Sequence, residues 1–327
     1  MGGIVISGTG SFLPGQVITN SDLEMMVDTT DEWITTRTGI KERRICPRGM
    51  ASSDMGTEAS KDACKDAGIS PSELELIICS TITPDNSFPS TACLIESKLG
   101  IKNIPVFDIS AACSGFIFGL EIAKGLMLGG GYKTGLVVAS ECMSRVTDYT
   151  DRSICVLLGD GSGAAVLKQS GEDGIMGSYL SADGGYGDLL NLPAGGSANP
   201  ASFDTVEKRM HFMKMEGASL FKVAIRAMSD SVNKLIDRFS LRKEDIALVI
   251  PHQANLRIIN GVAKDLNMPA DKFYVNIEKY GNMSAACIPI ALDEVSKKGL
   301  IKKGDLIVTV AFGGGLTWGA NLIRWTR

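Results

Sequence analysis

Short apolar segments typical of buried β-strands alternate with helix-like segments along almost the whole chain, and this alternation restricts the possible folds most strongly. In the first half, the expected strands cover residues 3–8, 76–80, 104–109, 136–139 and 164–167. Helical patterns lie between them at residues 53–67, 90–99 and 113–128. Continuous apolar runs of this length are typical of strands covered on both faces. The pattern therefore predicts an α/β protein in which helices pack on buried sheets.

The second half of the chain repeats this alternation. Expected helices and strands cover residues 216–239, 246–250, 255–266, 283–298, 306–312 and 318–324. A glycine-rich turn leads into the last strand of each half, at residues 159–167 and 313–322. We interpret this similarity as an internal duplication, with halves at residues 1–172 and 173–327. The glycine-rich residues 184–200 are expected to form a surface loop.

Composition narrows the class of protein. The 327 residues, of which 44% are hydrophobic and 21% are charged, can bury a large core. A net charge of −4 argues against nucleic acid as the main partner. No run of about 18 apolar residues and no signal-peptide pattern is found, so we expect no membrane span and a cytoplasmic location. The eight cysteines form no CxxC pair, so we expect reduced thiols and no metal site.

Cys113 lies at a position where a reactive thiol is expected. Cys113 follows an apolar strand and a turn of small residues, and it precedes a helical pattern. Backbone N–H groups and the helix dipole at such a position favour thiolate over thiol. Cys113 is therefore a candidate nucleophile, although a buried structural thiol is an equal alternative on local sequence alone.

Two further polar residues occupy comparable turns. His252 directly follows the expected strand 246–250, and Asn282 lies in the turn at residues 280–284. Taken singly, His252 is more typical of a strand cap and Asn282 of a turn residue. A cysteine, a histidine and an asparagine that each follow a strand or precede a helix together favour nucleophilic thiol chemistry. His211, the other histidine, has no such context and is taken as structural.

The glycine-rich loops do not predict a nucleotide fold. No GxxxxGK[ST] sequence occurs, and Gly313-Gly314-Gly315 is followed by a strand pattern rather than a helix. Glycines at these positions are better explained by close approach of the backbone to a substrate.

Six segments in the same order give the chain a specific resemblance. They are residues 31–40 (DEWITTRTGI), 112–116 (ACSGF), 159–164 (GDGSGA), 252–255 (HQAN), 281–284 (GNMS) and 312–315 (FGGG). The chain resembles the β-ketoacyl-acyl-carrier-protein synthase III family of the thiolase-like superfamily. The resemblance implies duplicated βαβαβαββ halves that form a layered αβαβα sandwich.

The resemblance also implies a reaction. Cys113 takes the acyl group from a short acyl-CoA, and malonyl-acyl carrier protein then enters. His252 and Asn282 stabilise the enolate formed as carbon dioxide leaves, and this carbanion attacks the acyl-cysteine to give a β-ketoacyl carrier protein. The N–H groups of Cys113 and Gly314 are expected to form a second oxyanion hole. Fatty acid synthesis would begin with this step.

Binding residues follow from the same resemblance. Residues expected to contact coenzyme A are Thr29, Trp33, Arg37, Arg152, Gly217, Phe221, Ala254 and Asn255, with Trp33 and Arg152 on either side of the adenine ring. Phe88, reaching across a homodimer, and Phe312 are expected at the acyl pocket. Lys222, Arg257 and Lys264 are expected to dock the acidic carrier protein. No permanently bound cofactor is predicted, because coenzyme A arrives as the substrate thioester. Ala218 replaces an asparagine of the best-known relatives, which removes one expected tunnel hydrogen bond.

Other activities stay open at this point. A polyketide-type ketosynthase and a hydroxymethylglutaryl-CoA synthase share the fold, but the second uses a glutamate base for which no clear candidate follows the first catalytic segment. A Cys/His/Asn thioester hydrolase would have to admit water to the acyl-enzyme. A non-catalytic binding module would not need all three residues. The preferred acyl primer is not determined by the sequence.

Overall fold

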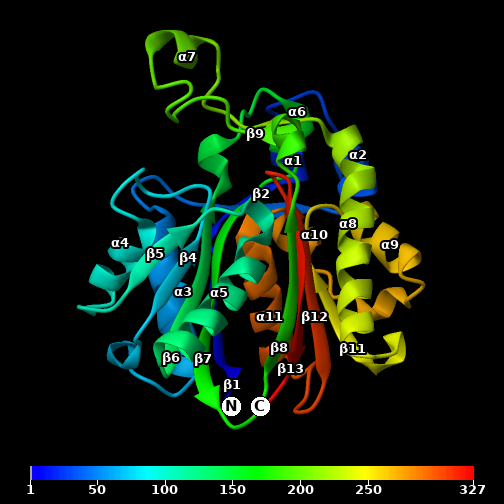
Figure 1. Cartoon of the computed structure of the whole chain (residues 1–327). Helices are drawn as coiled ribbons and strands as arrows, with labels where there is room; N and C mark the ends of the chain where they lie inside the picture. The colour runs from blue at the N-terminus through cyan, green and yellow to red at the C-terminus, as the bar shows by residue number, and fades with distance from the viewer. Residues whose placement is uncertain (1) are drawn as a thin grey trace.

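The computed structural model describes residues 2–327, which form two mixed β-sheets with helices between and outside them (Figure 1). The first sheet has the strand order β1-β7-β6-β4-β5. Its strands are β1 (Gly3–Phe12), β4 (Ile77–Ser80), β5 (Val106–Ile109), β6 (Thr134–Cys142) and β7 (Asp160–Ser170). β4 is parallel to β5 and β6, whereas β7 is antiparallel to β6 and β1.

The second sheet repeats this arrangement. Its order is β11-β12-β13-β8, with β11 parallel to β12 and the other pairs antiparallel. The strands are β8 (Ile175–Ala182), β11 (Ile246–Pro251), β12 (Leu306–Gly313) and β13 (Thr317–Arg324). A single parallel bridge from Val249 to Phe273 stands where the first sheet has β5. The boundary expected after residue 172 lies in the turn between β7 and β8, and the division into two halves at that point stays a prediction.

Helices complete five layers, as the fold prediction required. α5 (Gly115–Gly130) and α11 (Cys287–Lys297) lie between the sheets. α3 (Ser52–Asp66) and α4 (Thr91–Lys98) cover the first sheet, while α8 (Gly217–Arg238) and α9 (Leu256–Asp265) lie outside the second. The central core joins both sheets through side chains such as Phe116 and Ile117 of α5 and Ile288 and Leu292 of α11.

The central helix α5 is more apolar than the sequence analysis recognised. The segment Ala112–Gly130 is long and apolar enough to cross a membrane by length and composition. In the structure it lies between the two sheets, and Phe116, Ile117 and Leu120 are completely buried there. The apolarity of α5 is therefore that of a core helix packed on two sides.

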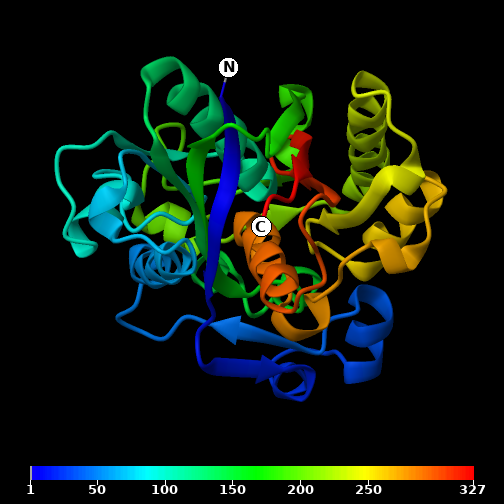
Figure 2. The same ribbon diagram turned by 90° about the horizontal axis from the view of Figure 1, so that it is seen from below.

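Several elements were not predicted. They are the eight-residue strand β8 of the second sheet, the paired strands β2 (Gln16–Thr19) and β3 (Glu42–Ile45), the paired strands β9 (Leu190–Asn191) and β10 (Lys214–Met215), and the short helices α1 (Asn20–Glu24), α6 (Arg152–Cys155), α7 (Phe203–Glu207) and α10 (Ile277–Tyr280). A further short helix, α2 (Asp31–Thr38), carries Trp33 and Arg37, whose spacing of four residues fits one helical face. Figure 2 shows β2, β3 and the first helices, in blue, on one side of the central layers. Except for β8, these elements are short and lack a clear apolar period, so sequence pattern alone identifies them poorly.

The glycines at residues 159–163 have a packing role. A Cβ atom on Gly159, Gly161 or Gly163 would come within 2.3 Å of the Tyr280 carbonyl oxygen, 2.7 Å of Met283 Sδ and 2.7 Å of the Ile290 nitrogen, respectively. Real Cβ atoms do not approach so closely. The motif thus lets β7 lie directly against the segment that carries Asn282.

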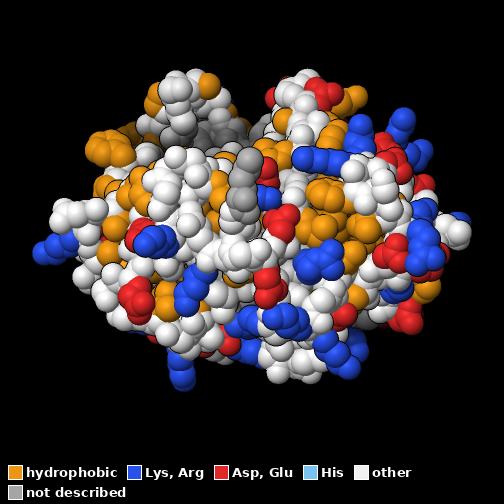
Figure 3. Space-filling view, turned by 60° about the horizontal axis from the view of Figure 1, so that its bottom comes forward, with side chains coloured by type: hydrophobic (Ala, Val, Ile, Leu, Met, Phe, Trp, Pro, Cys, Tyr) orange, Lys and Arg blue, Asp and Glu red, His pale blue; other side chains and the backbone are white. Residues whose placement is uncertain are grey.

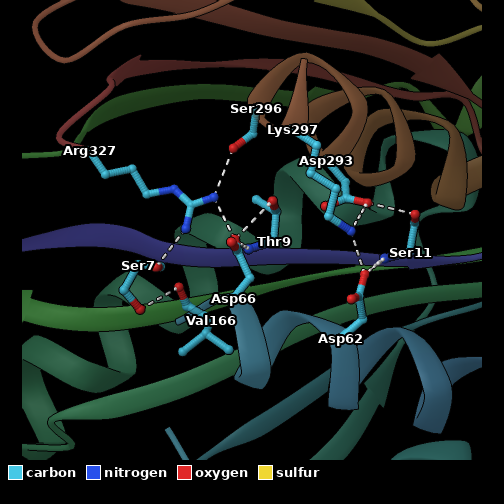
Figure 4. A network of polar contacts seen from close by, with 10 residues as sticks. All are labelled: Ser7, Thr9, Ser11, Asp62, Asp66, Val166, Asp293, Ser296, Lys297 and Arg327. Atoms are coloured by element: carbon cyan, nitrogen blue, oxygen red, sulfur yellow. Dashed lines mark hydrogen bonds and ion pairs between the residues drawn. The ribbon is translucent and has the colours of Figure 1, made fainter. Parts of the chain in front are cut away.

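Carboxylates close the outer edge of β1. The backbone N–H groups of Thr9 and Ser11 donate to Asp66 at 2.8 Å and Asp62 at 3.2 Å, both on α3. Ser11 Oγ also donates to Asp293 of α11 at 2.6 Å. Figure 4 shows this network, which continues to Ser7, Val166, Ser296, Lys297 and Arg327. An edge strand whose N–H groups are already paired offers no template for another chain.

On the face seen in Figure 3, no large region carries charges of one sign only. Basic and acidic side chains are interspersed there among apolar and polar ones. This mixture agrees with the small net charge of −4.

Candidate active site

The three predicted catalytic side chains meet at one cavity. Cys113 lies in the 3₁₀ turn Ala112–Ser114 that leads into α5, and Asn282 lies just before the corresponding turn Ser284–Ala286 that leads into α11. The two turns pack against each other. His252 follows the end of β11, and all three residues line a cavity of about 140 Å³. We call this space the tunnel cavity.

The two helix starts have the same unusual backbone. Ala112 and Ser284 both lie in the left-handed region, with φ values of 46° and 49°. Residues other than glycine seldom adopt this conformation, and it is typical of sites where the surrounding structure imposes it. Cys113 directly follows the left-handed residue of the first turn, and Asn282 lies two residues before that of the second, so the two side chains come from corresponding turns but not from equivalent positions.

Burial opposes the thiolate form that the sequence analysis expected at Cys113. The residue is only 9% exposed, and burial raises the pKa of its thiol to about 12. The nearby Ser284 hydroxyl lowers this pKa, whereas the negative charge of Glu141 raises it. Burial disfavours the charged form of the sulfur.

Gly313 packs against Cys113 so closely that no larger residue fits at this position. A Cβ atom on Gly313 would lie 2.6 Å from the Cys113 nitrogen and 3.1 Å from its Cβ. Gly314, which we had assigned to the oxyanion hole, is less confined, because its nearest contact would be the Leu190 carbonyl oxygen at 3.3 Å. The close approach to the nucleophile therefore depends on Gly313, which sequence reasoning did not single out.

His252 is held as a neutral imidazole. Its side chain is buried at 2% exposure, and burial lowers its pKa to about 3. The backbone N–H of His252 donates to the Val310 carbonyl at 2.8 Å, which fixes the turn. Within residues 2–327, Nδ1 has no hydrogen-bond partner. A neutral ring can donate one hydrogen bond but cannot hold an extra proton near neutral pH.

The amide of Asn282 has a defined orientation. Its Oδ1 accepts a hydrogen bond from the Ser284 backbone N–H at 2.9 Å. The Asn282 backbone donates to the Leu157 carbonyl at 2.8 Å and accepts from Gly159 at 3.0 Å. With Oδ1 engaged, the Nδ2 group is the part of the side chain available to donate to a ligand.

A second cavity adjoins the first. Cys113 and Asn282 line both, and the second has a volume of about 360 Å³. Its walls are mostly apolar, and they include Ile82, Met143, Val146, Leu157, Leu158, Leu190, Leu192, Met213 and Met215. Ser284 and Gly314 also line it. We call this space the apolar chamber.

The predicted coenzyme A residues divide into two groups. Gly217, Phe221, Ala254 and Asn255 all line the tunnel cavity together with His252. Phe312 also lines the tunnel cavity and not the apolar chamber, and its assignment to the acyl pocket stays a prediction. Its ring stacks on Trp318 with the centroids 6.5 Å apart, which keeps it against the second sheet.

The remaining coenzyme A residues lie outside both cavities. The Arg152 guanidinium lies 5.2 Å from the centre of the Trp33 ring, and its Nη1 donates to the Asp28 carbonyl at 2.6 Å. An aromatic ring between two such groups needs about 3.5–4 Å on each face. The predicted sandwich therefore requires Arg152 to move away from Trp33. Arg37 is exposed at the end of α2, and the buried Thr29 hydroxyl has no partner in the described chain.

The expected docking residues lie on neighbouring helices. Lys222 of α8 and Arg257 and Lys264 of α9 are exposed, and none of the three forms an ion pair with a described residue. The Arg257 guanidinium lies 5.5 Å from the centre of the Phe221 ring, which links this basic surface to the tunnel cavity.

Phe88 lines neither the tunnel cavity nor the apolar chamber of its own chain, but it lines a separate open pocket at the surface. Its side chain is 86% exposed, beside Ile82 and Ser110. Both of these neighbours also line the apolar chamber. Phe88 therefore stands at the outer side of the chamber wall.

One buried residue near the nucleophile was missed. Glu141 of β6 is completely buried, and its carboxylate accepts hydrogen bonds from Thr83 Oγ1 at 2.7 Å, Thr81 Oγ1 at 3.3 Å and the Ile82 N–H at 3.1 Å. Burial raises its pKa to about 7. The available signal was a glutamate at the end of an otherwise apolar strand segment, residues 136–142.

The described residues contain no group of three or more His, Cys, Asp and Glu side chains arranged to hold a metal ion.

Comparison with known proteins decides the family. Models of 3-oxoacyl-[acyl-carrier-protein] synthase III and of its C-terminal region match residues 107–184 and 236–325. A β-ketoacyl-[acyl-carrier-protein] synthase III of Caldanaerobacter subterraneus subsp. tengcongensis is 54% identical over 324 residues, with 98% of each chain covered. The chain belongs to the β-ketoacyl-[acyl-carrier-protein] synthase III family. Its members are acyltransferases, so the enzyme class expected from the sequence is confirmed.

Solved structures confirm the thiolase-like fold of this synthase III. The crystal structure of the Aquifex aeolicus 3-oxoacyl-[acyl-carrier-protein] synthase III is 48% identical, with a TM-score of 0.91 and 99% of this chain and 100% of that chain covered. The priming β-ketosynthase of the R1128 polyketide pathway is 33% identical with a TM-score of 0.92, covering 99% and 96% of the two chains. The Aquifex aeolicus synthase III is thus more similar in sequence than this polyketide enzyme, although the fold is common to both.

Proposed function

We propose that this synthase III condenses a short acyl-CoA with malonyl-acyl carrier protein and so initiates fatty acid synthesis. The observation that carries the proposal is the meeting of Cys113, His252 and Asn282, from both repeats, at the tunnel cavity. The same cavity contains four of the residues that we assign to coenzyme A. No group outside the chain is needed to complete this set.

The first half-reaction takes place at Cys113. Its sulfur attacks the thioester carbonyl carbon, and the developing oxyanion is stabilised by the backbone N–H groups of Cys113 and Gly314. Coenzyme A then leaves through the tunnel cavity past Gly217 and Asn255. The acyl group stays on the sulfur and extends into the apolar chamber. Burial of its hydrocarbon chain against the apolar walls stabilises it there.

The second half-reaction uses His252 and Asn282. Both donate hydrogen bonds to the malonyl thioester oxygen, which becomes negative as carbon dioxide leaves. Because His252 stays neutral and Asn282 does not titrate, both donors keep the same form across the working pH range. One such preorganised donor contributes about 3–4 kcal/mol to lowering the barrier. The enolate carbon then attacks the acyl-cysteine.

Exposed residues are proposed to bind the two substrates, the coenzyme A thioester and the carrier protein. Thr29, Trp33, Arg37 and Arg152 would hold the nucleotide of coenzyme A near the tunnel mouth. Lys222, Arg257 and Lys264 would pair with acidic side chains of the carrier protein, as their exposure and lack of ion-pair partners among the described residues allow.

A homodimer would explain the exposed Phe88. At 86% exposure this large apolar side chain is costly in water. Its neighbours Ile82 and Ser110 line the apolar chamber, so the partner's Phe88 could close the outer wall of that chamber. We propose a homodimer on this basis. The eight free cysteines fit a reducing compartment, and we propose that the protein is cytoplasmic.

A panel of acyl-CoA primers tests the function. Each primer is supplied with malonyl-acyl carrier protein, and the products are identified by mass. The proposal requires a β-ketoacyl carrier protein that is longer than the primer by two carbons. If acyl-CoA alone is converted to free acid at the same rate, the hydrolase alternative is correct instead. A product attached to coenzyme A rather than to the carrier protein would favour a polyketide-type enzyme.

A further inference from the structure

A flap from the second half of the chain forms part of the apolar chamber. We use this name for residues 190–215, which lie between β8 and α8 and include α7. The stem of the flap is the strand pair β9 and β10, in which Leu190 is paired with Met215. The walls that face an acyl group on Cys113 come partly from the flap, because the chamber is lined by Leu190, Leu192, Met213 and Met215.

The outer part of the flap is not packed against the body of the protein. In Figure 1, α7 projects above the two sheets. Phe203 of α7 is 98% exposed, and Val206 is 63% exposed. Burial of apolar surface therefore does little to fix this part of the flap, and its polar contacts decide where it lies.

Polar contacts join the flap to the segment that follows β6. The N–H of Met213 donates to the Val146 carbonyl at 2.8 Å. The Arg209 guanidinium donates to both carboxylate oxygens of Asp148, from Nε at 2.8 Å and also from Nη2. Within residues 2–327, no other hydrogen bond or ion pair joins the flap to a segment distant from it in the sequence.

The Asp148 carboxylate is fixed by its own loop. Its side chain is buried, and its Oδ1 accepts hydrogen bonds from the Thr150 N–H at 2.9 Å and from the Thr150 hydroxyl at 2.6 Å. The Arg209 side chain, by contrast, is about half exposed. A guanidinium that binds such a carboxylate with two parallel hydrogen bonds has one defined position. The ion pair therefore sets where the flap meets the first half of the chain.

Arg209 occupies a position that glycine usually fills. It directly follows α7 and Lys208, and its φ of 54° lies in the left-handed region. The Met210 N–H donates to the Thr205 carbonyl and the Arg209 N–H to the Val206 carbonyl, each at 3.0 Å. Glycine is the usual residue at the left-handed position of this helix ending. A residue that breaks such a local rule is expected to supply something else, and here the side chain supplies the contact with Asp148.

We propose that the Arg209–Asp148 pair is a latch that holds the flap against the apolar chamber and thereby gives the enzyme its ability to use primers larger than acetyl. This inference rests on the proposed function and deepens it, because it concerns the acyl group that Cys113 receives. Arg209 and Asp148 line neither the tunnel cavity nor the chamber. They are positioning residues that act through the chamber walls at Leu192 and Met213.

The size of the chamber explains why the latch matters for longer primers. An apolar cavity of about 150 Å³ holds a benzene molecule, whereas the chamber has a volume of about 360 Å³. Chains of four to six carbons therefore fit and extend toward Leu192 and Met213, which line the chamber but not the tunnel cavity. An acetyl group ends close to the sulfur. Each methylene that loses its apolar wall weakens binding by up to about fourfold.

The test compares acetyl-CoA, butyryl-CoA and hexanoyl-CoA as primers of the full-length enzyme. Condensation with malonyl-acyl carrier protein gives kcat and KM for each primer, and we expect the wild type to use all three. Arg209→Gln should keep the acetyl-CoA values within about twofold, and it should raise KM about fivefold for butyryl-CoA and at least about tenfold for hexanoyl-CoA. The kcat values should change little, because a lost apolar contact weakens the ground state and the transition state alike.

Three further variants make the result decisive. Lys208→Gln is the matched control, because Lys208 directly precedes Arg209 but pairs with Asp204 inside α7 at 2.9 Å. It removes the same charge and should keep the wild-type values for all three primers. Asp148→Asn keeps an oxygen for the Thr150 donors and should reproduce Arg209→Gln, with the double variant no worse than the worse single variant. Arg209→Lys keeps the charge without the paired hydrogen bonds and should recover part of the loss.

The outcomes separate this proposal from the proposed function. Unchanged kinetics in Arg209→Gln, equal effects on all three primers, or the same length-dependent loss in Lys208→Gln would overturn the latch. A wild type that uses acetyl-CoA but neither longer primer would overturn it as well. If Asp148→Asn does not fold, the Arg209 variants decide alone, because they change an exposed side chain. Failure of the wild type to condense any of the three primers with malonyl-acyl carrier protein would instead remove the proposed function.

Discussion

The two repeats use one backbone for two different chemical tasks. In the first repeat, Ala112 and Cys113 open α5, and in the second, Ser284 and Ala285 stand at the same points before α11. Likewise, Thr81 follows β4 as His252 follows the equivalent strand β11. The first repeat thus carries the nucleophile, and the second carries the groups proposed to stabilise the enolate. The two halves thus share a backbone geometry and differ in the side chains placed on it.

The repeats also differ in their buried titratable groups. The first repeat buries Glu141, whose pKa is raised to about 7, and the second buries His252, whose pKa is lowered to about 3. Both shifts arise mainly from burial, which disfavours the charged form of each group. The comparison therefore predicts separable effects on acylation, on decarboxylation and on stability.

The largest expected effect comes from the nucleophile. Cys113→Ala should abolish acyl-enzyme formation from acyl-CoA, because no other residue at the site can form the thioester. The fold should persist, because Ala285 occupies the equivalent position of the second repeat. Intact mass after exposure to acyl-CoA measures the adduct, and thermal unfolding serves as the control. An acyl adduct that survives this substitution would contradict the division between the repeats.

Substitutions in the second repeat should impair decarboxylation without impairing acylation. His252→Ala or Asn282→Ala should still accept the acyl group but should decarboxylate malonyl-acyl carrier protein about 10²–10³-fold more slowly, because one donor to the enolate oxygen is lost. Release of carbon dioxide measures this step. Normal condensation by His252→Ala would show that the second repeat does not stabilise the enolate.

Stability should depend on pH with opposite signs in the two repeats. The pKa of Glu141 rises from 4.5 to about 7 on folding, so its favourable contribution is complete below pH 4.5 and is lost as pH rises through 7. The pKa of His252 falls from 6.5 to about 3, so its contribution is present above pH 6.5 and is lost as pH falls toward 3.

Glu141→Gln isolates the first of these terms. Relative to wild type, its free energy of unfolding should increase by up to about 3 kcal/mol between pH 4.5 and pH 8, because the wild type alone must ionise a buried carboxyl group. Denaturant unfolding at the two pH values measures the change, with Glu294→Gln as the control, because Glu294 also accepts from two hydroxyls. A difference between wild type and variant that is independent of pH would show that Glu141 keeps its ordinary pKa.

The smallest effect is expected at the docking surface. Arg257→Glu or Lys264→Glu should raise the KM for malonyl-acyl carrier protein several-fold at low salt, because a rim charge mainly alters association. Acylation by acyl-CoA should not change. Lys65→Glu, on α3 at the other face of the molecule, is the matched control. Equal effects of all three variants would mean that only net charge matters.

Sequence pattern predicted the layers well for physical reasons, although it missed strand β8. Strands buried on both faces, such as β4 and β12, are continuous apolar runs that stand out from their surroundings. Cys113, His252 and Asn282 each follow such a strand or precede a helix, where side chains are free to meet.

The features that the sequence did not predict depend on which segments surround each residue in the folded protein. The direction of the Cys113 pKa shift reflects how many groups cover the sulfur, and these come from distant segments. Glu141 and Ser284 become neighbours only when the two repeats pack together. The contact of Arg152 with Trp33 and the position of Phe312 on the tunnel side likewise follow from tertiary packing.

The most direct measurement follows one sulfur through both half-reactions. The protein is exposed to a short acyl-CoA, freed of excess reagent and mapped by peptide mass, and malonyl-acyl carrier protein is then added. The account predicts one acyl group on Cys113 among the eight cysteines, which disappears as an equal amount of β-ketoacyl carrier protein forms. An unmodified Cys113, or an adduct that leaves only as free acid, would contradict it.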